Sequence, residues 1–234
     1  MTIAKIFLLA TCIAVASDPI YHIITTLFSK WRRNYKPRSL IDVLCQRYNI
    51  PPSSKNVHKV IFFPDTGLPC RRFLSGHACK DPRCYGVHHE TSLTVLLSVI
   101  NSCLHSLDVC VYMITCSSLG NALIECHERG VPVRVITDER NSGEEGEMTG
   151  CQIGKLRAAG INVRCHSSSF WMHHKFLVAD IEVLVNGSFN WTNQAVMGNF
   201  ENLMITSDKD LVHPYVEEFQ RLWEKFEPKE VVVD

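Results

Sequence analysis

The sequence predicts an α/β fold, a layered sandwich in which helices flank a central sheet. Short apolar runs typical of strands alternate with amphipathic runs typical of helices between residues 60 and 226. The composition is that of an ordinary globular protein, with 46% hydrophobic and 21% charged residues. At 234 residues the chain can bury one substantial core, so we expect a single folded domain.

The expected elements follow one another from residue 40 to residue 226. Helices are predicted where apolar residues recur every three or four positions, with Gly130 ending one helix and Asp208 capping the start of another. Strands are predicted where short apolar runs are bounded by turn residues. The predicted helices are 40–48, 91–104, 119–129, 151–159 and 211–226. The predicted strands are 60–63, 107–114, 131–137, 161–165, 173–179, 182–185 and 203–205.

Residues 1–33 predict an N-terminal membrane anchor. An apolar run at 6–16 is too short to cross a bilayer alone, but with a weaker run at 20–28 it is long enough. The basic cluster at 30–33 would then hold the following domain on the cytosolic side. A cleaved signal peptide is the alternative, because Ala14-Val15-Ala16 resembles a cleavage site. A linker at 34–56 would join the anchor to a folded domain at 57–230.

Cysteine usage and net charge indicate the cellular compartment of the domain and limit the partners that it can attract. The chain has eleven cysteines, most of them scattered through apolar stretches, which suits a reducing compartment and favours the anchor over secretion. Lys plus Arg and Asp plus Glu number 24 each, so the whole molecule sets up no field that attracts nucleic acid or anionic lipid. Any such attraction must come from a local patch.

The segment from His173 to Asp180 holds the candidate catalytic residues. Alternate side chains of a strand share a face, so His173 and Lys175 point one way while His174 and Phe176 point the other. An imidazole beside an ammonium group is unfavourable unless an anion lies between them, and a phosphate fits that need.

A second segment, 187–190, adds donors for such a phosphate. Gly187 permits a tight turn, after which Ser188 and Asn190 offer a hydroxyl and an amide. Donors of this kind can stabilise phosphoryl transfer without a catalytic metal, and no carboxylate cluster suited to two-metal catalysis lies nearby. The alternative is that His173 and His174 are ordinary histidines at a sheet edge and Lys175 is a solvated charge.

These residues resemble the signature of the phospholipase D superfamily, H-x-K-x4-D-x6-G-[GS]-x-N. The positions that it defines are filled by His173, Lys175, Asp180, Gly187, Ser188 and Asn190. The resemblance implies a central mixed sheet flanked by helices. It also implies that the histidine attacks phosphorus to form a phosphohistidine while the lysine and asparagine hold the phosphate.

Two further acidic residues enter through the resemblance. Glu201 matches a downstream glutamate that hydrogen-bonds the nucleophilic histidine in the family. Asp180 belongs to the catalytic signature, but we expect it to act mainly as structural support, because its strand parity is opposite to that of Lys175.

One copy of the motif is chemically insufficient. A histidine that becomes phosphorylated cannot also protonate the leaving oxygen, so a second acid is needed across the phosphorus. Family members supply it from a second copy of the motif, which this chain lacks. We therefore predict a homodimer in which two His173 residues face each other across the twofold axis.

Residues 70–88 predict a small zinc-finger insertion of the CCCH type. Three thiolates and one imidazole form a closed tetrahedral set, so the zinc would be structural. The predicted ligands are Cys70, Cys79, Cys84 and His88. His77 or His89 could replace His88, and buried cysteines without a metal are the alternative. Nearby cations could form a basic wall or be ordinary solvated charges: Arg71, Arg72, Lys80 and Arg83.

The anchor, the insertion and the single motif together resemble the mitochondrial branch of the superfamily. That resemblance implies a place on the mitochondrial outer membrane, facing the cytosol, and two substrates. One is single-stranded RNA, cut during Piwi-interacting RNA maturation to leave 5′-phosphate ends, with proteins of that pathway as partners. The other is cardiolipin, an anionic phospholipid, hydrolysed to phosphatidic acid.

RNA cleavage is the favoured activity, cardiolipin hydrolysis is the alternative, and a non-catalytic RNA-binding or membrane scaffold is a third. Phe170 and Trp171 could stack on bases, dip into lipid or pack in the core. Basic residues that could flank a strand-binding groove are Arg140, Lys155, Arg157 and Arg164.

Overall fold

The computed structural model describes residues 39–51, 56–141 and 150–228. The predicted anchor at 1–33 and part of the predicted linker, at 34–38 and 52–55, lie outside the described residues. Within the described ranges, no helix combines the length and the apolar character needed to cross a bilayer.

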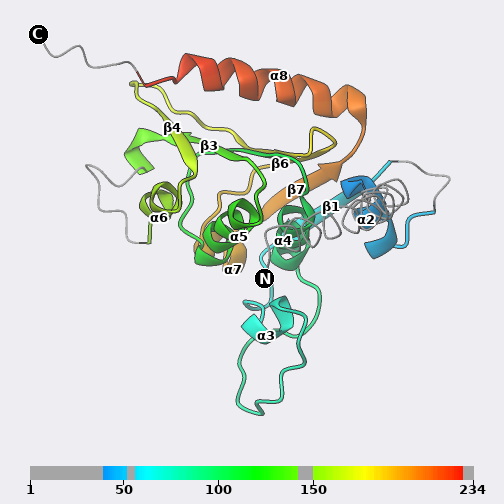
Figure 1. The fold of residues 1–234 in the computed structure, drawn as a ribbon. Coiled ribbons are helices and arrows are strands. Elements are labelled where there is room, and N and C mark those ends of the chain that lie inside the picture. The colour runs from blue at the N-terminus through cyan, green and yellow to red at the C-terminus, as the bar shows by residue number, and fades with distance from the viewer. Residues whose placement is uncertain (1–38, 52–55, 142–149, 229–234) are drawn as a thin grey trace, which may run out of the picture. The chain divides into compact units, whose positions relative to one another are not determined.

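The described residues form a seven-stranded mixed sheet in the order β1-β7-β6-β5-β2-β3-β4 (Figure 1). Strands β2, β3 and β4 run parallel, whereas every other neighbouring pair is antiparallel, including β5 against β2. The strands are β1 (His58–Phe63), β2 (Leu107–Val111), β3 (Val133–Asp138), β4 (Asn162–His166), β5 (Lys175–Ala179), β6 (Val183–Gly187) and β7 (Glu201–Thr206). The predicted mixed sheet is therefore confirmed.

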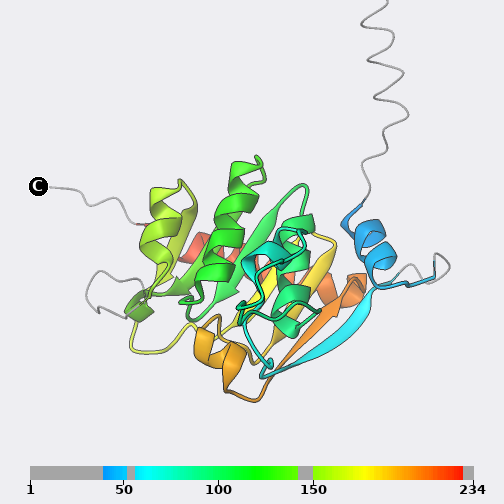
Figure 2. The same ribbon diagram turned by 90° about the horizontal axis from the view of Figure 1, so that it is seen from below.

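Helices cover both faces of this sheet. Figures 1 and 2 show α8 against one face and α4, α5 and α6 against the other, while the segment that contains α3 projects away from the sheet. The helices are α2 (Leu40–Arg47), α3 (Arg71–Leu74), α4 (Ser92–Ser102), α5 (Ser117–Glu128), α6 (Ile153–Ala158), α7 (Asn193–Met197) and α8 (Lys209–Lys225), with a 3₁₀ turn at Glu139–Asn141. The α/β layered sandwich is confirmed.

The two-residue alternation of β5 separates two hydrophobic cores. Leu177 and Ala179 lie in the core beneath α4 and α5, whereas Phe176 and Val178 lie in the core beneath α8. Helix α8 begins at the predicted cap, Asp208, whose carboxylate accepts a hydrogen bond from the backbone N–H of Asp210.

The folded unit begins earlier than the predicted residue 57. Ser39 caps α2, and the side chains of Leu40 and Leu44 are fully buried in the core shared with α4. The Tyr48 hydroxyl also forms a 3.0 Å hydrogen bond with Ser98 on α4. These contacts make α2 part of the folded unit instead of a linker.

Candidate active site

His173 lies at the start of β5, not inside it. The strand begins at Lys175, and the two residues before it are held by contacts outside the ladder. The Met172 backbone N–H donates to the Asp138 carboxylate at 3.0 Å, and Lys175 Nζ donates to the His173 carbonyl oxygen at 2.8 Å. The His174 carbonyl oxygen accepts from the Tyr112 backbone N–H at 2.9 Å. These bonds fix the backbone around an exposed imidazole.

Aromatic rings surround the His173 side chain. Its ring centroid lies 5.1 Å from that of Tyr112, edge to face, and 5.6 Å from that of Trp171. Lys175 Nζ lies 5.4 Å from the centroid of the same Tyr112 ring. His173 and Lys175 therefore share one face, as strand parity predicts.

His174 points to the opposite face. Its ring meets Phe176 at a centroid distance of 5.5 Å, and its Nε2 lies 3.5 Å from a carboxylate oxygen of Glu218 on α8. The neighbouring histidines thus have different surroundings, and only the first lies beside the lysine.

Burial and nearby charges shift the pKa values of His173 and Lys175. The pKa of His173 is lowered from 6.5 by partial burial and by the nearby Lys175 ammonium, while Asp138 opposes the shift. The pKa of Lys175, whose side chain is 8% exposed, is lowered by burial and raised again by Glu201. These surroundings favour the neutral imidazole, the form in which a histidine can act as a nucleophile.

The turn after β6 brings Ser188 and Glu201 together. A side chain at Gly187 would place its Cβ 2.0 Å from the Asn202 carbonyl oxygen, so only glycine allows the close approach of β7. The Ser188 backbone N–H donates to the same carbonyl at 3.1 Å, and the Ser188 hydroxyl donates to the Glu201 carboxylate. This turn therefore sets a hydroxyl and a carboxylate at the end of the sheet that Lys175 also occupies.

Glu201 makes contacts other than the implied one. Its second carboxylate oxygen accepts from Asn199 Nδ2 at 3.2 Å. Among the described residues, the hydrogen bonds of the Glu201 carboxylate go to Ser188 and Asn199, and none joins it to His173. Its implied bond to the histidine stays a prediction.

Asn190 is anchored by its neighbours while its own amide oxygen stays unpaired. Phe189 is buried and stacks on Phe63 with centroids 4.1 Å apart, and the Trp191 N–H donates to the Met113 carbonyl at 3.0 Å. Asn190 Oδ1 is buried and has no hydrogen-bond partner among the described residues. A buried unpaired carbonyl oxygen is unfavourable, which suits an acceptor that a donor group of a ligand completes.

Asp180 lies at the other end of β5 from His173. Its carboxylate accepts hydrogen bonds from the backbone N–H groups of Leu104, His105 and Ser106, at 2.6 to 3.1 Å, and from the Cys103 thiol at 3.0 Å. These contacts tie the start of β2 to the end of β5.

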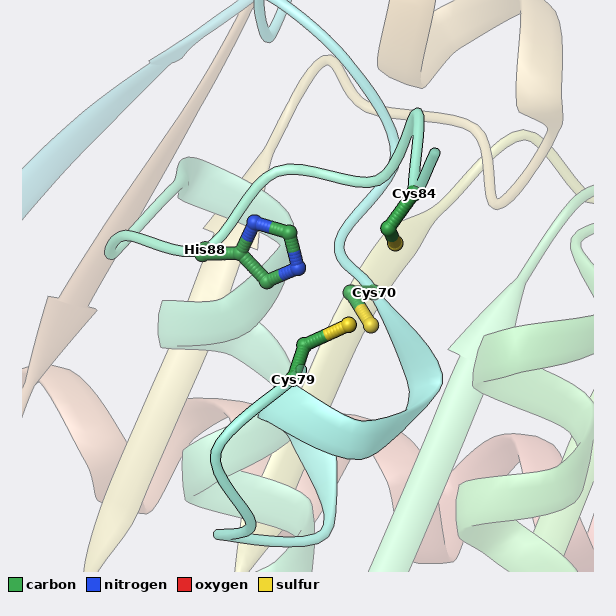
Figure 3. A group of neighbouring side chains, drawn as sticks. All are labelled: Cys70, Cys79, Cys84 and His88. Carbon is green, nitrogen blue, oxygen red and sulfur yellow. The ribbon is translucent and has the colours of Figure 1, made fainter. Parts of the chain in front are cut away.

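The predicted zinc ligands converge in one cluster (Figure 3). The cluster consists of Cys70, Cys79, Cys84 and His88. The three cysteine sulfur atoms and a ring nitrogen of the histidine all lie within 4.8 Å of one another. Hydrogen bonding from the Phe73 backbone lowers the pKa of Cys70 to about 6, which favours the thiolate that binds metal. The group could hold a tetrahedral ion with ligand bonds of about 2.0 to 2.3 Å.

The structure adds site residues that sequence patterns did not single out. Asp138 is fully buried and holds Met172, directly before the histidine, and Tyr112 contacts both His173 and Lys175. The signal for Asp138 was its place at the carboxyl end of a buried parallel strand, where functional groups gather.

The predicted groove cations have different places. Arg140 donates to the Ser168 and Phe170 carbonyls and lies 5.9 Å from the Trp171 ring, so it borders the site. Arg164 instead bonds Glu227 beyond α8, at 3.0 Å.

Comparisons with known proteins agree with this geometry. A family model described as "Cardiolipin synthase, PLD-like domain" matches residues 96–223. The mitochondrial cardiolipin hydrolase of Chlamydomonas reinhardtii is 40% identical over 170 residues, covering 73% of this chain and 74% of that protein. The mouse protein of the same name is 40% identical over 180 residues, covering 73% and 77%.

Solved structures show the same fold. Nuc from Salmonella typhimurium, a phospholipase D family member, has a TM-score of 0.54 at 23% identity and covers 72% of this chain and 95% of its own. NucT from Helicobacter pylori has a TM-score of 0.55 at 19% identity, covering 72% and 96%. The chain therefore belongs to the phospholipase D superfamily, through a PLD-like domain, and is a phosphodiesterase.

Proposed function

We propose that the protein hydrolyses a phosphodiester through a phosphohistidine on His173. One observation carries this proposal: the exposed His173 imidazole and the buried Lys175 ammonium lie on one face, against the same Tyr112 ring. Burial and then repulsion from Lys175 lower the pKa of His173, and a phosphate between the two groups relieves that repulsion. The Asn190 Nδ2 group supplies a further donor to its oxygens, and the Ser188 hydroxyl adds another when it turns from Glu201 to the phosphate.

The proposed reaction has two steps. In the first, a nitrogen of His173 forms a bond to phosphorus while the bond from phosphorus to the leaving oxygen breaks, and an acid protonates that oxygen. In the second, the conjugate base of that acid takes a proton from water, the water oxygen bonds to phosphorus, and the histidine–phosphorus bond breaks. Lys175 stabilises the negative charge on the phosphoryl oxygens throughout.

We propose that the acid is His173 of a second copy of the chain. The exposed position of His173 leaves room for a facing copy, and large apolar side chains beside the site are exposed in the single chain. Phe170 is 80% exposed and Phe200, next to Glu201, is 92% exposed. Apolar surface of this kind marks sites of association.

Cardiolipin is the substrate that we propose first. The sequence alone favoured RNA, but the names of relatives at 40% identity support cardiolipin and a mitochondrial location. The exposed Phe170 and Trp171 beside His173 suit a surface that meets lipid. We retain the outer mitochondrial membrane and the anchor at 1–33 as proposals.

Single-stranded RNA is a second candidate because of one contact. The Trp171 ring is 61% exposed, with the Arg140 guanidinium 5.9 Å from its centroid and the Tyr112 ring 5.8 Å away. An exposed aromatic ring beside a cation can stack a base next to a phosphate. Proteins of Piwi-interacting RNA maturation would be partners in that case.

We also propose that the cluster of three cysteines and one histidine holds a structural zinc. Cys70, Cys79, Cys84 and His88 fill all four positions of a tetrahedral ion, leaving none for a substrate or a catalytic water. The insertion would then gain its stability largely from the metal.

The test uses the purified full chain with cardiolipin vesicles and labelled single-stranded RNA in parallel. His173→Asn should abolish turnover of the true substrate, and His213→Asn, on the exposed surface of α8, should not. Mixing His173→Asn with wild-type chain should give inactive heterodimers. An active His173→Asn protein would refute the nucleophile, and fully active mixtures would refute the shared site.

A further inference from the structure

An open groove of about 410 Å³ adjoins His173 on the side of α8. One wall is the segment before β5 and the other is the last part of α8. Both His173 and His174 line it, although their side chains lie on different faces of the sheet. The residues that matter for its chemistry are Trp171, His173, His174, Glu218, Arg221 and Lys225.

Charges in the groove favour an anion near its outer end. Arg221 forms two hydrogen bonds with the Glu218 carboxylate, at 2.7 and 2.8 Å, and Glu218 also lies 3.5 Å from His174. Lys225 makes no ion pair within the described part of the chain and is exposed. Two cations against one carboxylate leave one net positive charge, even with both histidines neutral.

The groove lies within short reach of the reacting phosphorus. His173 and His174 are consecutive, so their Cα atoms are about 3.8 Å apart while their side chains diverge. Because His173, His174 and Lys225 line the same groove, an anion held near His174 and Lys225 lies in the space that adjoins a phosphate on His173. A substrate with two phosphates joined by a short bridge can fill both places.

The surroundings of the groove favour a lipid as that substrate. Met172 and Leu222 line it with largely buried apolar side chains, and Trp171 and Phe226 add aromatic surface. Cations next to apolar surface suit an amphiphile with an anionic head group. Cardiolipin carries two phosphates joined by one glycerol, whereas phosphatidylglycerol carries one.

We propose that this groove binds the second phosphate of a two-phosphate phospholipid while the first reacts at His173. The inference rests on the proposed phosphodiesterase function and deepens it. Lys225 is the main contact to the second phosphate, His174 adds a donor, and Glu218 limits the affinity by holding Arg221. The groove thereby selects cardiolipin over lipids with a single phosphate.

Three variants of the full chain test the groove on vesicles matched in total anionic lipid, with cardiolipin or phosphatidylglycerol as substrate. Lys225→Ala should raise KM for cardiolipin about tenfold, the loss of one charge-assisted hydrogen bond, and leave KM for phosphatidylglycerol within about twofold. Glu218→Gln releases Arg221 and should lower KM for cardiolipin. Lys209→Ala, an exposed lysine at the other end of α8, is the matched control and should change neither.

Other outcomes overturn the proposal. Equal effects of Lys225→Ala and Lys209→Ala on both lipids would indicate general attraction to an anionic surface. A rise in KM for single-stranded RNA alone would assign the groove to a polynucleotide. Lys225→Ala should not change the hydrolysis of bis(4-nitrophenyl) phosphate, which has one phosphate. If the wild-type protein does not hydrolyse this compound, the proposed phosphodiesterase function is refuted, and not the groove.

Discussion

Replacing Asp180 should destabilise the fold strongly while leaving the chemistry at His173 largely in place. The Asp180 carboxylate accepts from four donors: the Cys103 thiol and the N–H groups of Leu104, His105 and Ser106. This loop is partly buried, so we assign about 1 kcal/mol to each bond, which gives about 4 kcal/mol for Asp180→Ala. That is a large part of the stability of a typical domain.

Replacing Asp180 with asparagine separates the effect of losing the charge from the effect of straining the backbone. Asp180 has a φ of 56°, in the left-handed region that asparagine tolerates and alanine disfavours. Asp180→Asn keeps one acceptor oxygen but loses the charge, which halves the strength of each bond, so we expect a loss of about 2 kcal/mol. Alanine adds about 1 kcal/mol of backbone strain, which brings its expected total loss to about 5 kcal/mol.

Urea denaturation of the full chain, followed by circular dichroism, measures both losses. Activity is then compared per folded molecule with that of His173→Asn. Unchanged stability in Asp180→Ala would refute the structural role. A folded Asp180→Asn protein as inactive as His173→Asn would place this aspartate in the reaction.

Three further predictions test other parts of the site. Gly187→Ala should lower the unfolding free energy by about 3 kcal/mol, because its Cβ would meet a β7 carbonyl oxygen at 2.0 Å. Gly154→Ala in α6 is the control: its Cβ would meet nothing within 4 Å, so it should not lower the melting temperature. The acidic limb of kcat/KM should lie below pH 6.5, because the pKa of His173 is lowered; Lys175→Gln removes the repelling charge and should move that limb to higher pH. Cys79→Ser should release zinc, measured by atomic spectroscopy, and make residues 70–88 sensitive to protease, and a metal-free wild-type protein would contradict this prediction.

Strand alternation predicted the faces correctly, because the two-residue period is a property of the extended backbone. His173 and Lys175 share one face and Phe176 lies on the other, even though the ladder begins only at Lys175. The strand start could not be predicted, because the segment before it is held by the Asp138 carboxylate, which lies 34 residues before Met172 in the sequence.

Other features depend on tertiary contacts that a local pattern does not contain. Cysteine spacing alone left three histidines as candidates for the metal, and the structure brings His88 to the sulfur atoms while His77 pairs with Ser75. The short helix α7 was missed because its few residues show no period, and its start rests on a cap by Thr192. The place of α2 in the core depends on the burial of Leu40 against helices that lie far along the chain.

The pairing of β1 with β7 has a consequence for protein synthesis. Residues 58–63 leave the ribosome early, but their partners are 201–206, so β1 remains an open strand edge until nearly all of the described chain has been made. Glu201 takes its place opposite Phe63 only when this pairing closes. A nascent chain therefore carries its histidine and lysine before the adjoining turn and carboxylate are in position, and hydrolytic competence must await completion of translation.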